Sequence, residues 1–239
     1  GAAAGVAVVI FITALVNGLQ ANTLKRVLGT QADIVIRPAE EVARPQREPS
    51  PGEALLPRIE ARAQRLRSID QWQSLDLALQ TVPWIKAVSP MVSGPGFAVR
   101  GDATQAIARY GVEPVRYNRI VSVDEKLVAG EYRVQAGEAV IGKDLAKDLG
   151  LALGDRFRVV TAETDAPVSD AFTVTGIVDL GVRDLNRRTV FVTLRTAQTL
   201  LGLPGGATQL DLKIDDLFDA EDIAQGLEAQ TGLTVESWM

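Results

Sequence analysis

The sequence predicts an α+β fold in which a mostly β segment interrupts a domain of helices and strands. Residues 31–92 carry the pattern of a strand, a helix and a strand, and residues 194–239 that of a helix, a strand, a helix and a strand. Two such units can form one sheet with its helices on one face. Residues 93–193 consist mainly of short β-rich runs separated by Gly, Asp and Pro. We therefore expect one lobe from the two flanking segments and an inserted, mostly β lobe.

The composition excludes most of the common catalytic mechanisms. The chain has 239 residues with no Cys and no His, which excludes thiol nucleophiles, His-based triads and Cys/His zinc sites. Its 25 basic and 30 acidic side chains give a net charge of -5, which argues against a nucleic-acid-binding protein. The neighbouring carboxylates Asp215 and Asp216, like Glu40 and Glu41, point apart on a strand and form no acid–base pair. We expect no enzyme activity, cofactor or metal ligand in this chain.

Residues 1–30 are expected to form the end of a first transmembrane helix and a stalk. Only Thr13 among the first sixteen residues has a polar side chain, and no charge precedes Lys25. Sixteen helical residues span about 24 Å, less than the ~30 Å of hydrocarbon in a bilayer. Because the chain begins with Gly1 and not with Met, we expect the earlier part of this span to be missing. The residues expected inside the membrane are Val6, Val8, Val9, Ile10, Phe11, Ile12, Leu15 and Val16.

Two other interpretations of this first segment stay open. A signal peptide would carry basic residues at its start, and none precedes Lys25, although truncation would remove them. A buried helix of a soluble protein would show a polar stripe, which residues 1–16 lack.

The pattern after Val16 is amphipathic. Apolar residues recur at helical spacing over residues 19–28, and Gly29 provides a helix end. Residues 32–37 then have the pattern of a strand, which Pro38 ends. A helix that runs from the membrane directly into a folded domain would couple the two mechanically.

A linker and a helix are expected next. Residues 38–52 contain four prolines and almost no apolar side chain, which is typical of a loop whose purpose the sequence does not reveal. Apolar side chains at threes and fours over residues 53–82 predict a helix that Pro83 ends. Its arginines are explained more simply by a solvated helix face than by lipid headgroups.

The remaining elements are short. Residues 84–92 are expected to form a strand, residues 93–96 a turn, and residues 97–100 a second strand. Asp219 is expected to cap the last helix. Further strands are expected at 121–123, 139–141, 157–161, 172–178, 190–193, 209–214 and 234–237, and helices at 143–149, 194–201 and 220–230.

Two motifs resemble functional sites. Residues 137–144 have the spacing of a phosphate-binding loop, but Asp144 stands where the Ser or Thr that binds Mg²⁺ is required. We expect a strand, a turn at Gly142 and a helix there instead. Residues 179–188 form a dense polar loop that could hold a ligand carboxylate or a partner, although a charged hairpin tip is the commoner explanation.

The order of several segments resembles a known family. These segments are the hydrophobic start, residues 14–20, the strands at 32–37 and 85–90, and the block 139–155. Together they resemble the extracytoplasmic domain of ABC-transporter permeases of the MacB/FtsX superfamily, and most closely the lipoprotein-releasing permeases of the LolC/LolE type. The resemblance covers nearly the whole chain. It implies a porter-like strand–helix–strand lobe, an inserted mostly β lobe, and a second transmembrane helix after the last residue.

The same resemblance implies a location, a function and partners. The domain would lie on the periplasmic side of a bacterial inner membrane and couple cytoplasmic ATP hydrolysis to extracytoplasmic movement, with lipoprotein release or export as the outcome. Its partners would be an ABC ATPase, separate or fused, a second permease copy or paralogue, a periplasmic carrier or adaptor protein, and membrane lipids.

Two alternative functions stay open. One is MacB-type efflux of small molecules or peptides with a periplasmic adaptor. The other is FtsX-like regulation of a cell-wall hydrolase. A tethered enzyme is disfavoured because the sequence contains no catalytic constellation. The sequence does not tell the cargo, or whether the permease is a homodimer or a heterodimer.

Overall fold

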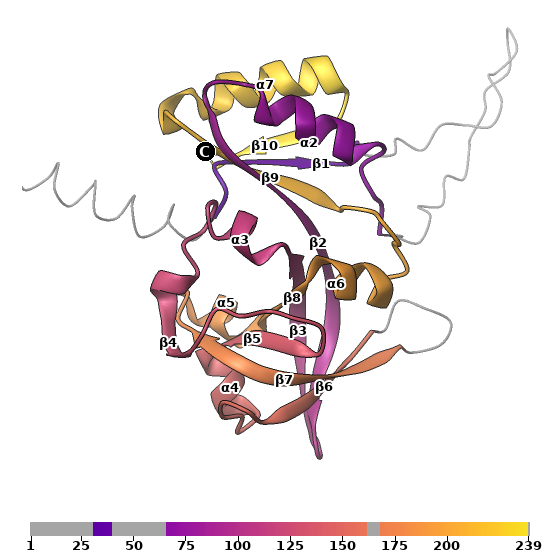
Figure 1. Ribbon diagram of the computed structural model, residues 1–239, viewed down its shortest axis with the longest axis vertical. Coiled ribbons are helices and arrows are strands. Elements are labelled where there is room, and N and C mark those ends of the chain that lie inside the picture. The colour runs from indigo at the N-terminus through magenta and orange to yellow at the C-terminus, as the bar shows by residue number, and fades with distance from the viewer. Residues whose placement is uncertain (1–30, 40–65, 162–167, 239) are drawn as a thin grey trace, which may run out of the picture.

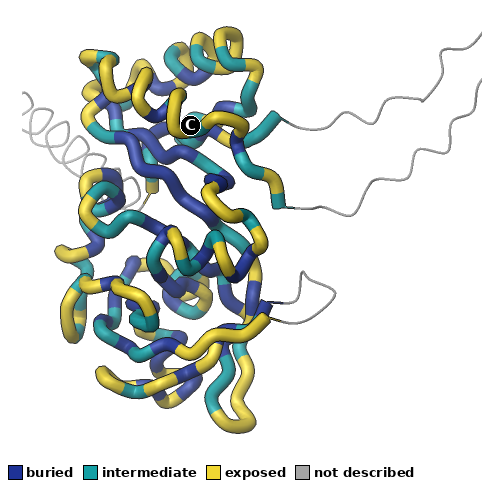
Figure 2. The backbone as a smooth tube through the Cα atoms, turned by 45° about the vertical axis from the view of Figure 1, so that its right-hand side comes forward, coloured by how far each residue is buried: buried dark blue, intermediate teal, exposed yellow. Residues whose placement is uncertain are grey.

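The computed structural model describes residues 31–39, 66–161 and 168–238. Their strands form one sheet in the order β10-β1-β9-β2-β3-β8-β5-β7-β4, and β6 pairs with β2 and β7 (Figure 1). The helices pack against this sheet, so the predicted α+β fold is confirmed. Figure 2 shows buried backbone running through the length of the molecule, with exposed segments mainly on helices and loops.

One end of the sheet carries both ends of the described chain, and we call it the terminal half. Its strands are all antiparallel, and α2 and α7 cover one face. The alternating Leu210, Leu212 and Ile214 are buried under these helices, as the strand pattern of residues 209–214 predicts. The terminal half comprises β1 (Ile34–Arg37), α2 (Trp72–Gln80), residues 85–91 of β2 (Ile85–Arg100), β9 (Gln209–Ile214), α7 (Ala220–Thr231) and β10 (Thr234–Ser237).

The rest of the sheet is the middle half. Two of its strand pairs are parallel, β3 with β8 and β5 with β7. One apolar cluster lies between these strands and α4 and α6, and a second contains Tyr117 and Phe191. The middle half comprises residues 91–100 of β2, β3 (Ala103–Val112), α3 (Pro114–Tyr117), β4 (Leu127–Gly130), β5 (Glu138–Gly142), α4 (Lys143–Asp148), β6 (Arg156–Val160), β7 (Ser169–Val178), α5 (Arg183–Arg188), β8 (Thr189–Thr193) and α6 (Leu194–Leu200).

The turn expected at residues 93–96 is wrong, because β2 continues through them as one strand of 16 residues. A Cβ on Gly94 would lie 2.8 Å from Leu201 Cδ2, so this glycine permits close packing and not a turn. Pro95 lies where β2 pairs with β3 on one side only, since the pairing with β9 ends at Met91 and the pairing with β6 begins at Phe97. A proline is tolerated at such a position.

Two other expectations are corrected. Residues 66–71 are not helical, because Ile69 N–H donates to the Ala207 carbonyl and Gln71 has a left-handed φ of 51° just before α2. Residues 121–123 form no strand, and they pack as a buried loop whose Val121 N–H donates to the Tyr117 carbonyl. In both cases the apolar residues that suggested a helix or a strand are part of the hydrophobic core without forming that element.

Strand β3 was not expected, whereas most of the later elements occur where the sequence predicts them. Helix α6 packs on β3 and β2, and its Leu194 and Ala197 are buried among residues of the middle half. A division of the chain at residue 193 therefore separates α6 from the strands that it covers. Asp219 stands at the start of α7, but its side chain forms no capping hydrogen bond there.

No helix in the described parts of the chain is long and apolar enough to cross a membrane. The residues expected inside the membrane, from Val6 to Val16, lie outside the described residues. So do the amphipathic segment 19–28 and most of the proline-rich segment 38–52.

Gly111 on β3 is expected to be essential for the packing of α6. A Cβ there would lie 2.1 Å from the Cβ of Ala197, so Gly111→Ala must push α6 away and should lower the free energy of unfolding by about 1–3 kcal/mol. Gly226→Ala on the exposed surface of α7 is the matched control, because its Cβ would meet nothing within 4 Å and a helical alanine is favoured by up to about 1 kcal/mol. Urea unfolding of both variants measures the difference, and equal stabilities would contradict the close packing of α6.

Candidate functional site

Asp33 fixes the point at which the chain enters the sheet. Its carboxylate is fully buried, with Oδ1 accepting a hydrogen bond from Lys213 Nζ at 2.7 Å and Oδ2 accepting one from the Ile214 N–H at 3.0 Å. Its own N–H donates to the Leu212 carbonyl. A buried carboxylate is stable when it is both ion-paired and hydrogen-bonded, so Asp33 holds the start of β1 firmly against β9.

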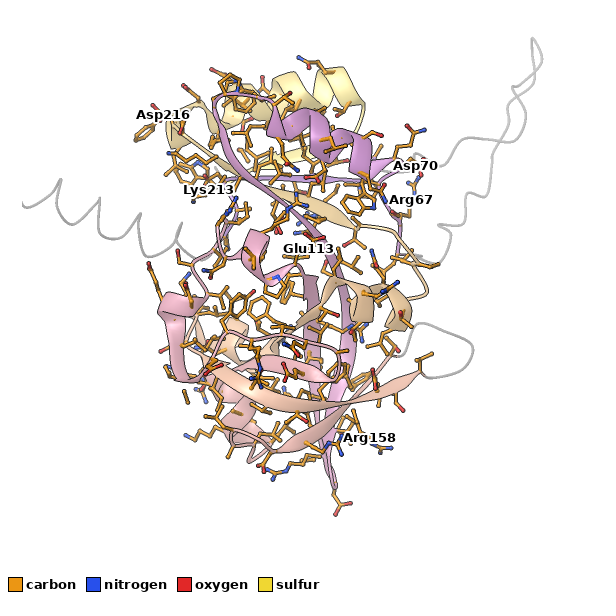
Figure 3. The ribbon with its side chains drawn as sticks, viewed as in Figure 1. Arg67, Asp70, Glu113, Arg158, Lys213 and Asp216 are labelled. Atoms are coloured by element: carbon orange, nitrogen blue, oxygen red, sulfur yellow. The ribbon has the colours of Figure 1, made fainter. Side chains whose placement is uncertain are left out.

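The last described residue lies beside this entry point. The Trp238 N–H donates to the Asp33 carbonyl at 3.1 Å, directly after the antiparallel pairing of β10 with β1. Figure 1 shows the C-terminal end beside β1, and Figure 3 shows Lys213 on this side of the terminal half. The indole Nε1–H of Trp238 donates to the Leu217 carbonyl at 3.0 Å. Entry and exit of the described chain are therefore adjacent.

Strand β2 connects the two halves of the sheet without a break. It pairs with β9 from Ile85 to Met91 and with β3 from Met91 to Arg100. Met91 is thus the residue at which the strand exchanges one partner for the other, and it is almost fully buried. We call the region around Met91 the waist.

Arg116 of α3 joins the halves at the free edge of β2. Its Nη2 and Nε donate to the Val88 carbonyl at 2.8 and 3.1 Å, and Nη2 also pairs with the Asp76 carboxylate on α2. Glu113 contacts the same guanidinium at 3.4 Å. Because α3 belongs to the middle half and α2 to the terminal half, one side chain ties both to the strand that they share.

A glycine-rich segment makes the second crossing between the halves. Residues 202–208 lead from α6 to β9 and are held by side chains that lie near the start of α2. The Trp72 indole donates to the Gly205 carbonyl at 2.8 Å, and Ser68 Oγ accepts from the Ala207 N–H at 3.0 Å. A Cβ on Gly206 would lie 2.8 Å from Ser68 Oγ, so the close approach requires glycine.

An aromatic cluster and a buried carboxyl lie between the halves. The rings of Tyr110, Tyr117 and Tyr132 lie 5.7–6.3 Å from the ring of Phe191, centroid to centroid. Burial raises the pKa of Asp211 on β9 to about 7, although a hydrogen bond from Gln209 and the charge of Arg37 act in the opposite direction. Burial also raises the pKa of Tyr117 well above its ordinary value, with the charge of Asp211 as the second cause.

An open groove of about 540 Å³ runs past the clamp formed by Arg116. It lies between the first residues of α3 and of α6, and its rim carries Val115, an apolar side chain that is 76% exposed. Figure 3 shows Glu113 at the waist between the two halves. Among the described residues, its lining contains no group of catalytic residues.

The phosphate-loop spacing at residues 137–144 is occupied by β5 and α4. The ammonium of Lys143 pairs with Asp179 at 2.5 Å, so it is engaged by a carboxylate of this chain. This hydrogen bond, with others from Gly181 and Asn186, lowers the pKa of Asp179 to about 2. The motif is therefore a structural one in this chain.

The polar loop expected at residues 179–188 contains the short helix α5. Asn186 is buried, accepts the Leu180 N–H at 2.7 Å and donates to Asp179 at 2.8 Å. Asp215 pairs with Lys86, whereas Asp216 caps a 3₁₀ turn by accepting the Phe218 N–H, so the two neighbours are not an acid–base pair. Glu40 and Glu41 lie outside the described residues. No group of three or more potential metal ligands occurs in the described ranges.

Sequence reasoning missed the residues that organise the waist. Asp33, Arg116 and Asp211 are polar, and none of them is assigned a role from the sequence. The alternation of Gln209, Asp211 and Lys213 gives β9 an apparently polar outer face, which the middle half covers in the structure. Only the position of Asp33, directly before a buried strand, is a local signal that could have been used.

We expect the clamp between Arg116 and Asp76 to stabilise the junction of the halves. Arg116→Ala leaves the Asp76 carboxylate buried without this partner and should lower the free energy of unfolding by about 3 kcal/mol. The double variant with Asp76→Ala should lose less than the sum of the two single losses, by at least about 1 kcal/mol. Arg119→Ala, an exposed neighbour, should change stability by less than about 0.5 kcal/mol. Strict additivity of the two single losses in urea unfolding would contradict the clamp.

Comparison with known proteins agrees with this architecture. The chain is 27% identical over 232 residues to the lipoprotein-releasing system transmembrane protein LolE of Haemophilus influenzae, covering 93% of this chain and 50% of that protein. It is 26% identical over 165 residues to the lipoprotein-releasing system transmembrane protein LolC of Xylella fastidiosa, covering 65% of this chain and 40% of that protein. The chain thus spans about half the length, or less, of these relatives.

A solved structure and a family profile extend the comparison. The periplasmic region of MacB from Actinobacillus actinomycetemcomitans shares the fold, with a TM-score of 0.53 and 16% identity over 89% of this chain and 91% of that one. The resemblance noted in the sequence is therefore confirmed. The model of the family described as the MacB-like periplasmic core domain matches residues 1–230, so the chain belongs to this family.

Proposed function

We propose that this chain is the periplasmic domain of an ABC-transporter permease that couples cytoplasmic ATP hydrolysis to lipoprotein release from a bacterial inner membrane. The observation that carries the proposal is the adjacency of Asp33 and Trp238. A membrane-like sequence precedes Asp33, and a second transmembrane helix after Trp238 would put two spans under one edge of the sheet. Movement of either span then acts on the same pair of strands.

The contacts at this edge suit the transmission of force. Asp33 is held by an ion pair and by two backbone hydrogen bonds to β9, so a displacement of the entering chain is passed to the strand next to β2. From β9 it reaches β2, which continues into the middle half. A chain of paired strands is stiff along its length. At the glycine-rich segment 202–208 and at Arg116 the halves are joined instead by side-chain hydrogen bonds and an ion pair, which must break or rearrange if the halves shift.

The partners follow from the same proposal. An ABC ATPase, either a separate subunit or a fused domain, would supply the movement, and a second permease copy or paralogue would complete the pair of permeases. A periplasmic carrier or adaptor would receive or pass on the cargo, and membrane lipids would surround the first helix. We propose residues 31–92 with 194–239, and residues 93–193, as the two functional lobes. Helix α6 (Leu194–Leu200) is the exception, because it packs on the second lobe and would move with it.

MacB-type efflux is the second candidate function. The similarity of the fold to the periplasmic region of MacB supports it. The two candidates differ in what leaves the membrane, because lipoprotein release transfers an acylated protein to a soluble carrier, whereas efflux requires a docked adaptor.

The full permease with its ATPase in proteoliposomes tests the proposed function. A fluorescent lipoprotein in the same bilayer should appear in the supernatant when ATP and a soluble carrier are added, and a permease without residues 31–239 should release none. ATP-dependent export of a small molecule with no lipoprotein release would favour the second candidate and contradict the first.

A flexible spacer at the stalk should uncouple ATP hydrolysis from release. Insertion of Gly-Ser-Gly-Ser between Thr30 and Gln31 adds a flexible spacer before Asp33, so under the proposed coupling lipoprotein release should fall by about tenfold or more while ATP hydrolysis persists. The control is the same insertion between Gln135 and Ala136, which are exposed and distant in sequence from this edge. Release that is unaffected by the stalk insertion would exclude mechanical coupling through residue 33.

A further inference from the structure

Asp211 lies on the face of the terminal half that the helices α2 and α7 do not cover. In the register of the sheet it stands opposite Val35 of β1 and Ser89 of β2. Residues opposite one another in antiparallel strands share a face, so these three side chains point the same way. Only 3% of Asp211 is exposed to solvent.

The middle half covers the sheet face on which Asp211 lies. Tyr117 of α3 and Tyr110 of β3 are close enough to Asp211 for its charge to raise the pKa of both phenols, after the larger effect of burial. Met91, at the point where β2 changes partners, lies in the same apolar cluster as Tyr117. Ala32 and Ala87 of the terminal half pack against this cluster, so the middle half covers the face on which Asp211 lies, and separation of the halves would expose Asp211.

The described polar neighbours of Asp211 are few for a carboxyl group that is buried. Gln209 Nε2 donates to Oδ1 at 2.7 Å, which is the hydrogen bond that the described structure gives this side chain. The hydroxyl of Ser89, directly opposite, is buried and has no hydrogen-bond partner among the described residues. A serine hydroxyl can accept from a protonated carboxyl or donate to a carboxylate, so Ser89 is compatible with both states, and the burial of Asp211 is what disfavours its charged form.

The charged groups around Asp211 provide little compensation. Arg37 of β1 acts on it through space, but this guanidinium is exposed and pairs with Glu236. Lys213, two residues along the strand, is engaged by Asp33. The charge of Lys213 also acts on Lys126, and the phenols of Tyr110, Tyr117 and Tyr132 come from β3, α3 and the loop before β5. Arg116 of α3 is engaged by Asp76, Glu113 and the Val88 carbonyl. Arg109 is the neighbour of Tyr110 on β3 and therefore points to the opposite face of the sheet.

We propose that Asp211 is a proton-sensitive latch between the two halves, which keeps them together while its carboxyl is neutral and favours their separation when it is ionised. This regulation rests on the proposed function, since it controls the same movement about the waist. Separation would hydrate Asp211 and move Tyr117 and Tyr110 away from it, while the continuous strand β2 keeps the halves connected.

The direction of the pH effect follows from the two states of the carboxyl. In the closed arrangement the pKa is raised to about 7, and in water it returns towards the ordinary value of 3.8. Between these values the closed state binds more protons than the open one, so closing is favoured at low pH and is lost as pH rises towards and past 7. Within this window the ratio of closed to open molecules falls by up to about tenfold per pH unit.

Distances between spin labels test the latch on the full chain in lipid nanodiscs. The chain has no Cys, so cysteines introduced at Leu77 and Val182 would be the only labelling sites. Both positions are exposed, and they lie in α2 of the terminal half and just before α5 of the middle half. Between about pH 5.5 and pH 8.5 the fraction of molecules with a long inter-label distance should rise by about tenfold or more.

The variant Asp211→Asn separates the latch from a general effect of pH. Asparagine has the shape of the neutral carboxyl, so this variant should fold and keep the short distance at both pH values. Asp215→Asn, which removes an exposed carboxylate near the end of the same strand, should keep the pH response of the parent chain. The proposal would be overturned if the inter-label distances of the parent chain did not change with pH. It would also be overturned if the change with pH persisted in Asp211→Asn.

Infrared spectroscopy gives a second, direct reading. The closed parent chain should show a protonated carboxyl band that disappears with a midpoint near pH 7 and that is missing in Asp211→Asn. A carboxyl at position 211 that is ionised throughout would overturn the latch. Lipoprotein release in the reconstituted permease is measured independently. The latch can therefore fail while the proposed function stands, and the proposed function can fail while the latch stands.

Discussion

The continuity of β2 is the constraint on which the rest of the structure depends. This strand of 16 residues pairs with both halves of the sheet, because β9 pairs with its first part and β3 with its second. The backbone hydrogen bonds of both halves are satisfied only if this strand stays extended through Met91. The glycines within it, Gly94 and Gly96, permit neighbours to approach closely without adding a bend. The halves are thus joined by a stiff element and can rearrange only where weaker contacts hold them.

Two buried aspartates show how the same residue type serves different purposes. Asp33 has a lysine and a backbone amide for its two oxygens, so its burial strengthens the edge at which the chain enters and leaves. Asp211 lies in an equally buried position but lacks a partner cation in contact, and its ionisation therefore opposes the closed arrangement. Under the proposed function, the domain would need both kinds of contact, one that holds during a movement and one that can be released. Neither requires His or Cys, which agrees with the composition.

The sequence predicts the fold class and most of the later strands and helices, because apolar alternation in segments such as 209–214 reports local burial directly. It fails where burial or pairing depends on distant segments. The Ser-Gly-Pro-Gly run of β2 has the composition of a turn, and only the position of Leu201 and the one-sided pairing of the strand explain why it is extended. Arg116 and Asp211 look like ordinary surface residues until α3 is folded against the waist. The membrane-like start is strongly indicated by composition but lies outside the described residues.

Hydrogen–deuterium exchange of the full permease in nanodiscs tests the central claim most directly, namely that the halves move relative to one another about an intact β2. Exchange would be compared between the nucleotide-free state and a state trapped with bound ATP. The account predicts changed protection in residues 202–208 and 113–117, with the amides of Ile85–Arg100 protected equally in both states. Loss of protection along β2, or no change at either waist segment, would contradict it.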